Sequence, residues 1–440
     1  MKTAVLGGGL TGIALARMLN EKGHDVTVLE KEKMTGGLCR SQTKDGFTFD
    51  IGGSHIIFSR DKEVNDFMCD VLGENKEKRN RNTKIFFKGA YVKYPFENGL
   101  YQLLPEDRFF CINEFVKNLI ALEKGELKDP KNFKEWIYHT FGKGIAESYM
   151  VPYNEKIWNY PTERMSHHWV DGRIPRPPVE DIIKSAIGIE TEGYTHQSVF
   201  TYPVRGGIEA LVDSLKEPVL DKIRTGFEVT TIKKEGDEFL IGNGSDWVKC
   251  EKIISTLPPK VLLSCLSDVP KDVKTACENL KYNSIACVSI GVKEDPGDIS
   301  WLYIPQKELG YFNRISFPSN YSSEVAPKGC SSVLAEITYN EGDEISKMSD
   351  SELISHVKDG LLKMNIIKDK SSVVYSDISR FEYAYVVYDL DYLKNVKIMK
   401  EYFESAGIEL VGRFSEFEYL NMDGCIRHVI DYIKKLEISK

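Results

Sequence analysis

The sequence predicts an α/β fold in which a parallel-sheet domain, an inserted helical domain and an antiparallel-sheet domain share one chain of 440 residues. Three observations predict it. The first forty residues have the pattern of a strand, a glycine turn, a helix and a second strand, which is the pattern of a parallel β-α-β unit. Apolar residues recur at helical spacing in 112–122 and 133–145, and β-type runs dominate from 284 to 387.

The N-terminal unit carries the glycine pattern of a dinucleotide-binding turn. An apolar run leads directly into Gly7, Gly9 and Gly12. Gly7 allows the tight turn, Gly9 lets the backbone approach a pyrophosphate, and Gly12 lets helix and strand pack closely. The free N–H groups of the helix N-terminus then face the phosphates. Glu30, at the end of the second strand, is suited to bind ribose hydroxyls. We therefore predict a Rossmann-type domain.

A second glycine loop favours a flavin over a nicotinamide cofactor. Segment 31–40 contains Gly36, Gly37 and Arg40, and it resembles the second signature of glutathione-reductase-type FAD proteins. In that superfamily this loop continues along the pyrophosphate and ribose of FAD. We therefore predict a glutathione-reductase-like domain with FAD as its cofactor.

A third loop follows the predicted strand 47–51. Gly52 and Gly53 let the backbone pass close to a flat ligand, and His55 comes soon after. One interpretation places the loop against the isoalloxazine ring, with His55 near the reactive edge. The other is a turn whose histidine caps a neighbouring carbonyl. The predicted FAD favours the first.

Composition limits the class of protein and its partners. A net charge of −8 and a pI near 5.7 argue against nucleic acid or an anionic membrane as the main partner. Apolar runs stay well below the roughly 18 residues of a membrane span. The first residues enter a strand at once, so we expect no signal peptide and a cytoplasmic protein. The nine cysteines form no CxxC motif and no Cys/His cluster, so we expect no metal site and no disulfide framework.

The FAD-binding domain is predicted to be discontinuous, because strand patterns that fit it return twice. It comprises 1–75, 201–260 and 405–440, with the helical insertion at 76–200 and a β-sheet substrate domain at 261–404. The insertion includes a predicted strand pair near 84–92. Further strands are predicted at 227–232 and 408–411, and a helix closes the chain.

Separate stretches resemble UDP-galactopyranose mutases and follow one another in that family's order. The stretches similar to the eukaryotic enzymes are 94–98, 132–146, 152–158, 165–166, 169–173, 301–305, 312–314 and 319–322. Two loops, 53–56 and 419–423, are nearer to the bacterial enzymes. Together these stretches are far more specific than the glycine motif alone.

The resemblance implies an isomerase, an intramolecular transferase that interconverts the pyranose and furanose forms of a nucleotide sugar without net oxidation. UDP-galactopyranose and UDP-galactofuranose are the default pair, as in cell-surface polysaccharide biosynthesis. In this family N5 of the reduced flavin attacks the anomeric carbon as UDP leaves, giving a flavin N5–sugar adduct, and a different hydroxyl then recloses the sugar ring. The active cofactor would therefore be reduced FAD. The protein itself must supply cations that hold the diphosphate.

The family motifs assign roles to individual residues of this chain. The predicted catalytic residues are Arg173, Arg314 and His55. The predicted substrate-binding residues are Trp158, Arg173, Tyr303, Arg314, Asn320 and Tyr419. The predicted cofactor-binding residues are Gly7, Gly9, Leu10, Thr11, Gly12, Glu30, Lys31, Gly37, Leu38, Arg40, Gly53, Ser54, His55, Val229, Gly412, Arg413, Asn421 and Met422.

Simpler interpretations stand beside these roles. Either arginine could be a solvated surface charge, Tyr303 could pack within its strand, and Trp158 could anchor a core. The mixture of eukaryotic and bacterial motifs leaves open whether the substrate differs from that of the family. The sugar, the nucleotide base, the physiological reductant and a homo-oligomeric state are likewise open.

Two other functions compete with the mutase. The first is an FAD-dependent oxidoreductase of the protoporphyrinogen oxidase or amine oxidase type, which shares the N-terminal signatures and should have an apolar substrate tunnel. The second is an FAD-stabilised binding protein without catalysis. The intact glycine loops and the polar flavin-facing candidates argue against the second alternative.

Overall fold

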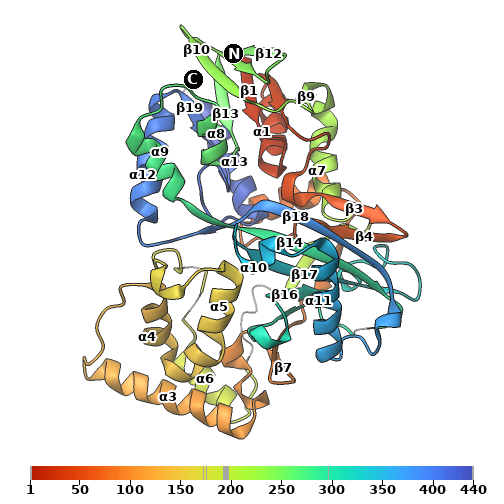
Figure 1. The fold of residues 1–440 in the computed structure, drawn as a ribbon, viewed down its shortest axis with the longest axis vertical. Helices are drawn as coiled ribbons and strands as arrows, with labels where there is room; N and C mark the ends of the chain where they lie inside the picture. Colours follow the sequence, from red (N-terminus) through yellow and green to blue (C-terminus); the bar gives the residue numbers. More distant parts are fainter. Residues whose placement is uncertain (1, 172, 175, 192–197, 296, 439–440) are drawn as a thin grey trace.

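The structure, a computed structural model, describes residues 2–171, 173–174, 176–191, 198–295 and 297–438. In Figure 1 a parallel sheet and its helices form the upper part, a mixed sheet crosses the middle, and a group of helices forms the lower part. Both ends of the chain lie at the top, near the parallel sheet.

Separate stretches of the sequence form the parallel sheet. In spatial order its strands are β19 (Ile408–Leu410), β13 (Lys252–Ser255), β1 (Lys2–Leu6), β2 (Asp25–Leu29) and β9 (Ile223–Arg224). All of β1 after Lys2 is buried, as expected of a strand with neighbours on both sides and helices on both faces. The helices around it are α1 (Leu10–Glu21), α7 (Glu209–Lys216) and α13 (Met422–Ile438). The predicted strand at 408–411 and the closing helix are confirmed.

The second large sheet is mixed. In spatial order its strands are β18 (Val373–Val387), β14 (Lys281–Val292), β17 (Ser331–Tyr339), β16 (Arg314–Ser316), β15 (Trp301–Tyr303), β6 (Thr83–Phe87) and β7 (Ala90–Lys93). Only the β15–β6 pair is parallel among the described strand pairs of this sheet. Helix α11 (Asp350–Lys363) packs against it and starts with a capping box, in which Ser349 and Glu352 exchange side-chain and backbone hydrogen bonds.

The lower helices are α3 (Pro105–Glu123), α4 (Phe133–Ile145), α5 (Val151–Trp158) and α6 (Val179–Ala186). The predicted strand pair near 84–92 is present as β6 and β7, but β6 pairs with β15. The expected helical insertion therefore also supplies two strands to the mixed sheet. The α/β fold with mixed sheets is confirmed, and the exact domain boundaries stay a prediction.

Smaller elements complete the fold. The remaining strands are β3 (Ser41–Lys44), β4 (Phe47–Asp50), β5 (Glu77–Asn80), β8 (Val199–Tyr202), β10 (Thr231–Glu235), β11 (Glu238–Gly242) and β12 (Trp247–Cys250). The remaining helices are α2 (Lys62–Val71), α8 (Pro259–Ser264), α9 (Lys271–Asn279), α10 (Glu344–Lys347) and α12 (Tyr392–Ser405).

The predicted strand 227–232 was wrong over most of its length. β10 begins only at Thr231, and residues 227–230 belong to no helix or strand. Phe227 and Val229 are buried in the core instead, which explains why an apolar alternation there resembled a strand.

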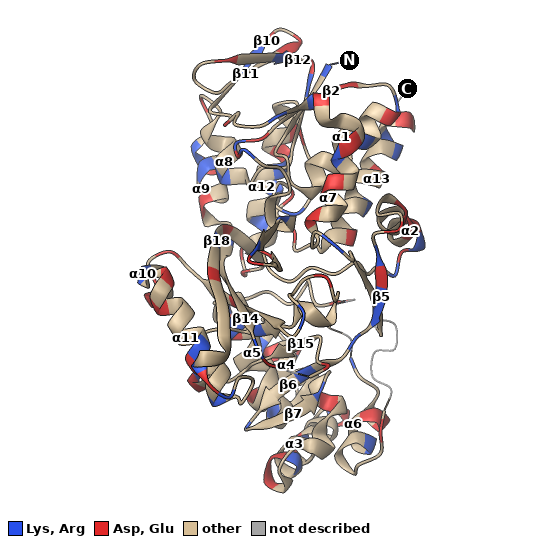
Figure 2. Cartoon of the chain, turned by 90° about the vertical axis from the view of Figure 1, so that its right-hand side faces the viewer, with Lys and Arg blue, Asp and Glu red and all other residues tan. Residues whose placement is uncertain are grey.

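Charges of both signs are mixed over the outer helices. Figure 2 shows Lys or Arg together with Asp or Glu on α1, α9, α11 and α13. Among the described residues, no helix is both long and apolar enough to cross a membrane.

Asp50, the last residue of β4, joins segment 41–50 to segment 202–208, which is far away in sequence. Its Oδ1 accepts hydrogen bonds from Ser41 Oγ at 2.8 Å and from the Ile208 N–H at 2.9 Å. The Tyr202 hydroxyl donates to the same carboxylate at 3.0 Å. Burial raises the pKa of Asp50 to about 6, and the hydrogen bonds it accepts oppose that rise.

Replacement of Asp50 should lower the free energy of unfolding, because this hydrogen-bond network is lost. Asp50→Ala leaves several buried donors without an acceptor, so we expect a loss of about 3 kcal/mol or more in the free energy of unfolding. Asp50→Asn keeps one acceptor oxygen, so its free energy of unfolding should fall by less. Denaturant titration of both variants checks this, and equal losses for Asn and Ala would contradict it.

The stability that Asp50 contributes depends on pH, and the sign of this dependence follows from its pKa. The pKa of Asp50 in the folded protein, about 6, lies above its ordinary value of 3.8, so between these values the folded state binds the proton more tightly than the unfolded chain. Asp50 therefore contributes stability below about pH 4 that is lost as the pH rises through about 6. Relative to Asp50→Asn, the wild type should gain roughly 2.5 kcal/mol of stability between pH 7 and pH 4.

Candidate functional site

A cavity of about 440 Å³ lies where the parallel sheet meets the mixed sheet. Its walls include the glycine loops after β1 and β2, the 52–56 loop, and residues of β15 to β18. The predicted residues that line it are Gly7, Gly9, Leu10, Thr11, Gly37, Leu38, Gly53, Ser54, His55, Tyr303, Arg314, Arg413, Tyr419, Asn421 and Met422. The fold thus gathers most of the predicted site in one place.

The two N-terminal glycine loops face each other at one end of the cavity. The Gly36 N–H donates to the Gly8 carbonyl at 2.8 Å, and Gly9 and Gly36 form a parallel bridge. A Cβ on Gly12 would lie 1.9 Å from the Gly7 carbonyl oxygen, so only glycine fits this turn. The N-terminus of α1 is left open toward the cavity, without an acidic side chain in its first turn. This is a cradle in which a pyrophosphate fits.

Glu30 lies behind this cradle rather than in the cavity wall. Its carboxylate accepts from the Gly8 N–H at 2.6 Å and from the Glu32 N–H at 2.9 Å. The predicted contact with a ribose stays a prediction. Other predicted cofactor residues that do not line the cavity are Gly12, Lys31, Arg40, Val229 and Gly412.

His55 follows the glycine pair of the third loop, and its ring contacts a neighbouring carbonyl as the second interpretation expects, whereas a place near the reactive edge of a flavin stays a prediction. It lines the cavity, and its Nδ1 lies 2.7 Å from the Gly53 carbonyl oxygen. Burial lowers the pKa of His55 to about 4, an effect that the Gly53 carbonyl opposes and that Arg314 and Arg413 increase. His55 is therefore neutral at pH 7, and the carbonyl partner assigns the proton to Nδ1. Nε2 is then a hydrogen-bond acceptor.

Arg314 on β16 forms a two-bond ion pair with Glu336 on β17. Arg314 Nε lies 2.9 Å from Oε1 and Nη2 lies 2.7 Å from Oε2 of Glu336. Burial alone would lower the pKa of Arg314, but Glu336, with Tyr385 and Tyr303, raises it well above its ordinary value. Arg314 therefore stays charged, and its charge is balanced within the protein.

The C-terminal loop closes another side of the cavity. Arg413 donates from Nη1 to the Leu420 carbonyl at 2.6 Å and from Nη2 to the Ala384 carbonyl. Gly412 has a φ of +95°, and a Cβ there would lie 2.6 Å from Thr11 Cγ2. This close contact joins the C-terminal loop to the first turn of α1.

Tyr419 lies between two arginines. The guanidinium groups of Arg173 and Arg413 lie 4.5 and 4.8 Å from the centre of its ring, and Arg173 Nη2 donates to its carbonyl. Arg173 is exposed and does not line the cavity. Its predicted partnership with Arg314 is therefore not present in this arrangement, because Arg173 is held on the Tyr419 ring.

Trp158, Tyr303 and Asn320 take different positions. Trp158 is buried, contacts the Tyr419 ring at 5.4 Å and donates to Asn154, so it acts as a core anchor beside the cavity. Tyr303 lines the cavity, and its hydroxyl accepts from Trp301 Nε1 at 3.1 Å. Asn320 does not line it, because its amide donates to the carbonyls of residues 297 and 299.

Sequence reasoning missed several residues of the cavity wall. They are Arg81, Trp301, Glu336 and Tyr385. Glu336 had a usable signal, because a lone charge in an apolar strand is unusual. Arg81 was hidden in a run of charged residues, and only the fold shows that Tyr94 and Trp301 lie 5.0 and 4.8 Å from it.

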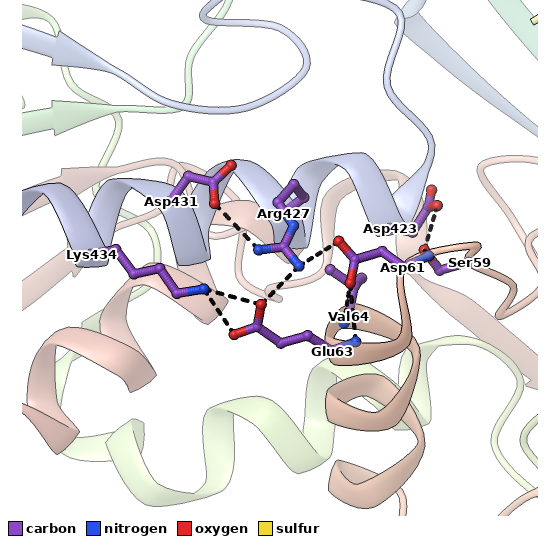
Figure 3. A network of polar contacts seen from close by, with 8 residues as sticks. All are labelled: Ser59, Asp61, Glu63, Val64, Asp423, Arg427, Asp431 and Lys434. Atoms are coloured by element: carbon purple, nitrogen blue, oxygen red, sulfur yellow. Dashed lines mark hydrogen bonds and ion pairs between the residues drawn. The ribbon is translucent and has the colours of Figure 1, made fainter. Parts of the chain in front are cut away.

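A charged network fastens α13, whose first residues line the cavity, to the start of α2. Figure 3 shows Ser59 donating to Asp423 at 2.9 Å, and Arg427 contacting Asp61 and Glu63. Lys434 reaches Glu63 at 3.0 Å. The network holds the segment that carries Asn421 and Met422.

Comparison with known proteins places the chain in a family. Residues 10–393 match the family described as flavin containing amine oxidoreductase. The chain belongs to this family. Membership supports a flavin cofactor, FAD, and the glycine cradle, the open helix N-terminus and the cavity fit one.

A crystal structure of reduced UDP-galactopyranose mutase is similar to this flavoprotein over nearly the whole of both chains. The TM-score is 0.90 at 27% identity, covering 100% of this chain and 96% of that one. The predicted resemblance to that enzyme family is thereby confirmed. Cyclohexylamine oxidase from Brevibacterium oxydans shares the fold, with a TM-score of 0.69 at 14% identity and 99% of each chain covered.

Curated relatives of the flavoprotein match over short stretches. An uncharacterized protein in the nifH2 3' region of Methanothermococcus thermolithotrophicus is 52% identical over 61 residues, 14% of this chain and 59% of that protein. A 4,4'-diapophytoene desaturase of Staphylococcus aureus is 50% identical over 57 residues, 13% of this chain and 11% of the desaturase. The matches thus span under two thirds of either relative.

Gly412→Ala should impair retention of FAD in this flavoprotein. The added Cβ must push Thr11 out of the cavity wall, and such overpacking costs on the order of 1–3 kcal/mol, or about tenfold or more in affinity. Gly407→Ala is the matched control, because it also has a positive φ, +77°, but its Cβ would lie no nearer than 3.4 Å to a neighbour. The ratio of flavin to protein absorbance checks both variants. Equal FAD content would contradict the expected role.

Proposed function

We propose that this flavoprotein is an isomerase that interconverts the pyranose and furanose forms of a nucleotide sugar, by default UDP-galactose. The observation that carries the proposal is the set of arginines in the cavity wall, Arg81, Arg314 and Arg413, beside the cradle for FAD. A diphosphate leaving group needs such cations. The likeness to reduced UDP-galactopyranose mutase supports the same conclusion.

In the proposed site, the chain's own residues bind and orient the ligand. When bound, reduced FAD supplies the nucleophile and the electron pair of the reaction. Arg314 directs its guanidinium to the diphosphate, and Tyr303 and Tyr419 offer hydroxyl groups to it. Neutral His55 offers Nε2 as an acceptor within the cavity.

Arg173 has a separate part in the proposal. Its guanidinium lies on the Tyr419 ring and donates to the Tyr419 carbonyl. We propose that it exchanges this carbonyl for a phosphate oxygen when the nucleotide sugar binds. The exchange costs little free energy, because Arg173 is exposed and because a hydrogen bond to a phosphate replaces the hydrogen bond to the carbonyl.

A second candidate function is the oxidation of an apolar substrate, as in amine oxidases. The observation that favours it is an apolar stretch of the cavity wall, formed by Ile56, Phe58, Val199 and Phe200. The family and its oxidase members share the fold. Arginines in the same wall favour an anionic ligand instead, so we place this function second.

Binding of UDP tests the diphosphate role directly. Arg173→Ala and Arg314→Ala should each weaken UDP binding about ten- to a hundredfold, because a charge-assisted hydrogen bond to a buried group is worth roughly 1.5–3 kcal/mol. Lysine should restore binding only in part, because it lacks the planar fork. Calorimetric titration of UDP measures this, with the flavin spectrum as a check of folding. Arg164→Ala, at an exposed arginine in the same part of the chain, is the control. Unchanged UDP affinity in both variants would remove the main support for a nucleotide-sugar ligand.

The balance of electrons separates the two candidate functions. Dithionite-reduced protein incubated anaerobically with UDP-galactose should give a furanose product by chromatography without consuming reductant in proportion. The oxidised protein should give none. Steady uptake of oxygen with release of hydrogen peroxide, in the presence of an amine or another apolar substrate, would support the oxidase instead.

A further inference from the structure

Glu336 is a charged residue in the middle of an apolar strand. It is fully buried on β17, as are its neighbours Ala335 and Ile337. A carboxylate in such a place is strongly unfavourable unless it is both paired and hydrogen-bonded. The position of Glu336 therefore depends on its partners, which are Arg314 and the main chain of Ser54.

The first partner fixes the direction of a cation. Arg314 is opposite Glu336 in the β16–β17 ladder, and two hydrogen bonds of 2.9 and 2.7 Å hold its Nε and Nη2. A two-bond contact of this kind sets the plane of the guanidinium. Within the described part of the chain, Nη1 of Arg314 has no acceptor, and Arg314 lines the cavity. Nη1 is thus the group left for a ligand.

The second partner fixes the loop that carries His55. The Ser54 N–H donates to Glu336 Oε1 at 3.0 Å, and the Ser54 carbonyl accepts from Arg314 Nη2 at 3.3 Å. The ion pair therefore contacts Ser54 on both its N–H and its carbonyl side. His55 comes next and lines the same cavity.

We propose that Glu336 is a positioning residue for the reaction: it aims Arg314 at the diphosphate and holds the 53–55 loop in place. Its carboxylate also balances the charge of Arg314. Arg314 then acts on the ligand through a directed hydrogen bond more than through net charge. The inference about the ligand rests on the proposed function, whereas the inference about the loop does not.

Glu336→Gln tests the role of the charge. Glutamine keeps the shape of the side chain, but its amide nitrogen cannot accept the hydrogen bond that Arg314 Nη2 donates to the second carboxylate oxygen. We expect kcat to fall about tenfold or more, because a hydrogen bond to a charged group is lost. UDP should bind more weakly than to wild type, because Arg314 loses one of the two hydrogen bonds that direct its guanidinium toward the diphosphate. The midpoint potential of bound FAD should rise, because a negative charge beside the cavity is removed.

Glu336→Asp tests the geometry separately. Aspartate keeps the charge, but it is one methylene shorter and cannot reach both partners. We expect the potential to stay at the wild-type value while kcat falls as in the Gln variant. Thr338→Val is the matched control, because Thr338 is two residues further on the same face of β17 and bonds the Lys156 carbonyl away from the cavity. Thr338→Val should change neither kcat nor the midpoint potential of bound FAD.

The results of these experiments distinguish a failure of the positioning role of Glu336 from a failure of the proposed function. If both Glu336 variants match wild type in kcat, UDP affinity and potential, Glu336 has no positioning role. If wild type does not bind UDP but Glu336→Asp still speeds amide hydrogen exchange at Ser54, the proposed function fails and the loop role stands. If Glu336→Gln does not fold, Glu336→Asp decides, because it retains the ion pair with Arg314.

Discussion

The contact between the two N-terminal glycine loops is the constraint on which the rest of the structure depends. Gly9 and Gly36 approach each other backbone to backbone, and Gly12 packs on the Gly7 carbonyl. A side chain at Gly12 would push α1 away from the turn that follows β1. The C-terminal loop then rests on the same turn through Gly412 and Thr11, so the first and last parts of the chain close on one cavity.

Cations in and beside the cavity wall are held in different ways, and the differences give them different properties. Arg314 is balanced by a buried carboxylate, Arg413 is held by two carbonyls and three aromatic rings, and Arg173 lies exposed on Tyr419. A balanced cation is fixed in direction, because moving it would leave Glu336 unpaired. An exposed one is free to change partners at little cost. The candidate site thus combines a fixed donor in the cavity wall, Arg314, with an exposed donor beside it, Arg173.

The pattern of motifs predicted the fold class well, because each signal was local. Gly7 to Gly12, the helical spacing of 133–145 and the β-type runs of 284–387 depend only on neighbouring residues, and all have the expected structure. Segment 227–232 failed for the opposite reason, since Phe227 and Val229 are buried by contacts with distant residues. The pairing of β6 with β15 was equally invisible, because those strands are far apart in sequence.

The sequence by itself determined the turn chemistry, the periodicity of the elements and the residue types that can hold phosphate and flavin. Only the tertiary structure decided which of those residues share a cavity. Asn320 and Arg173 have suitable chemistry, but other backbone carbonyls hold their side chains outside it. Glu336 and Arg81 line the cavity because strands from distant segments of the sequence pair beside it. The physical reason is that local preference acts over a few residues, whereas burial, charge balance and cavity shape arise only when the whole chain is packed.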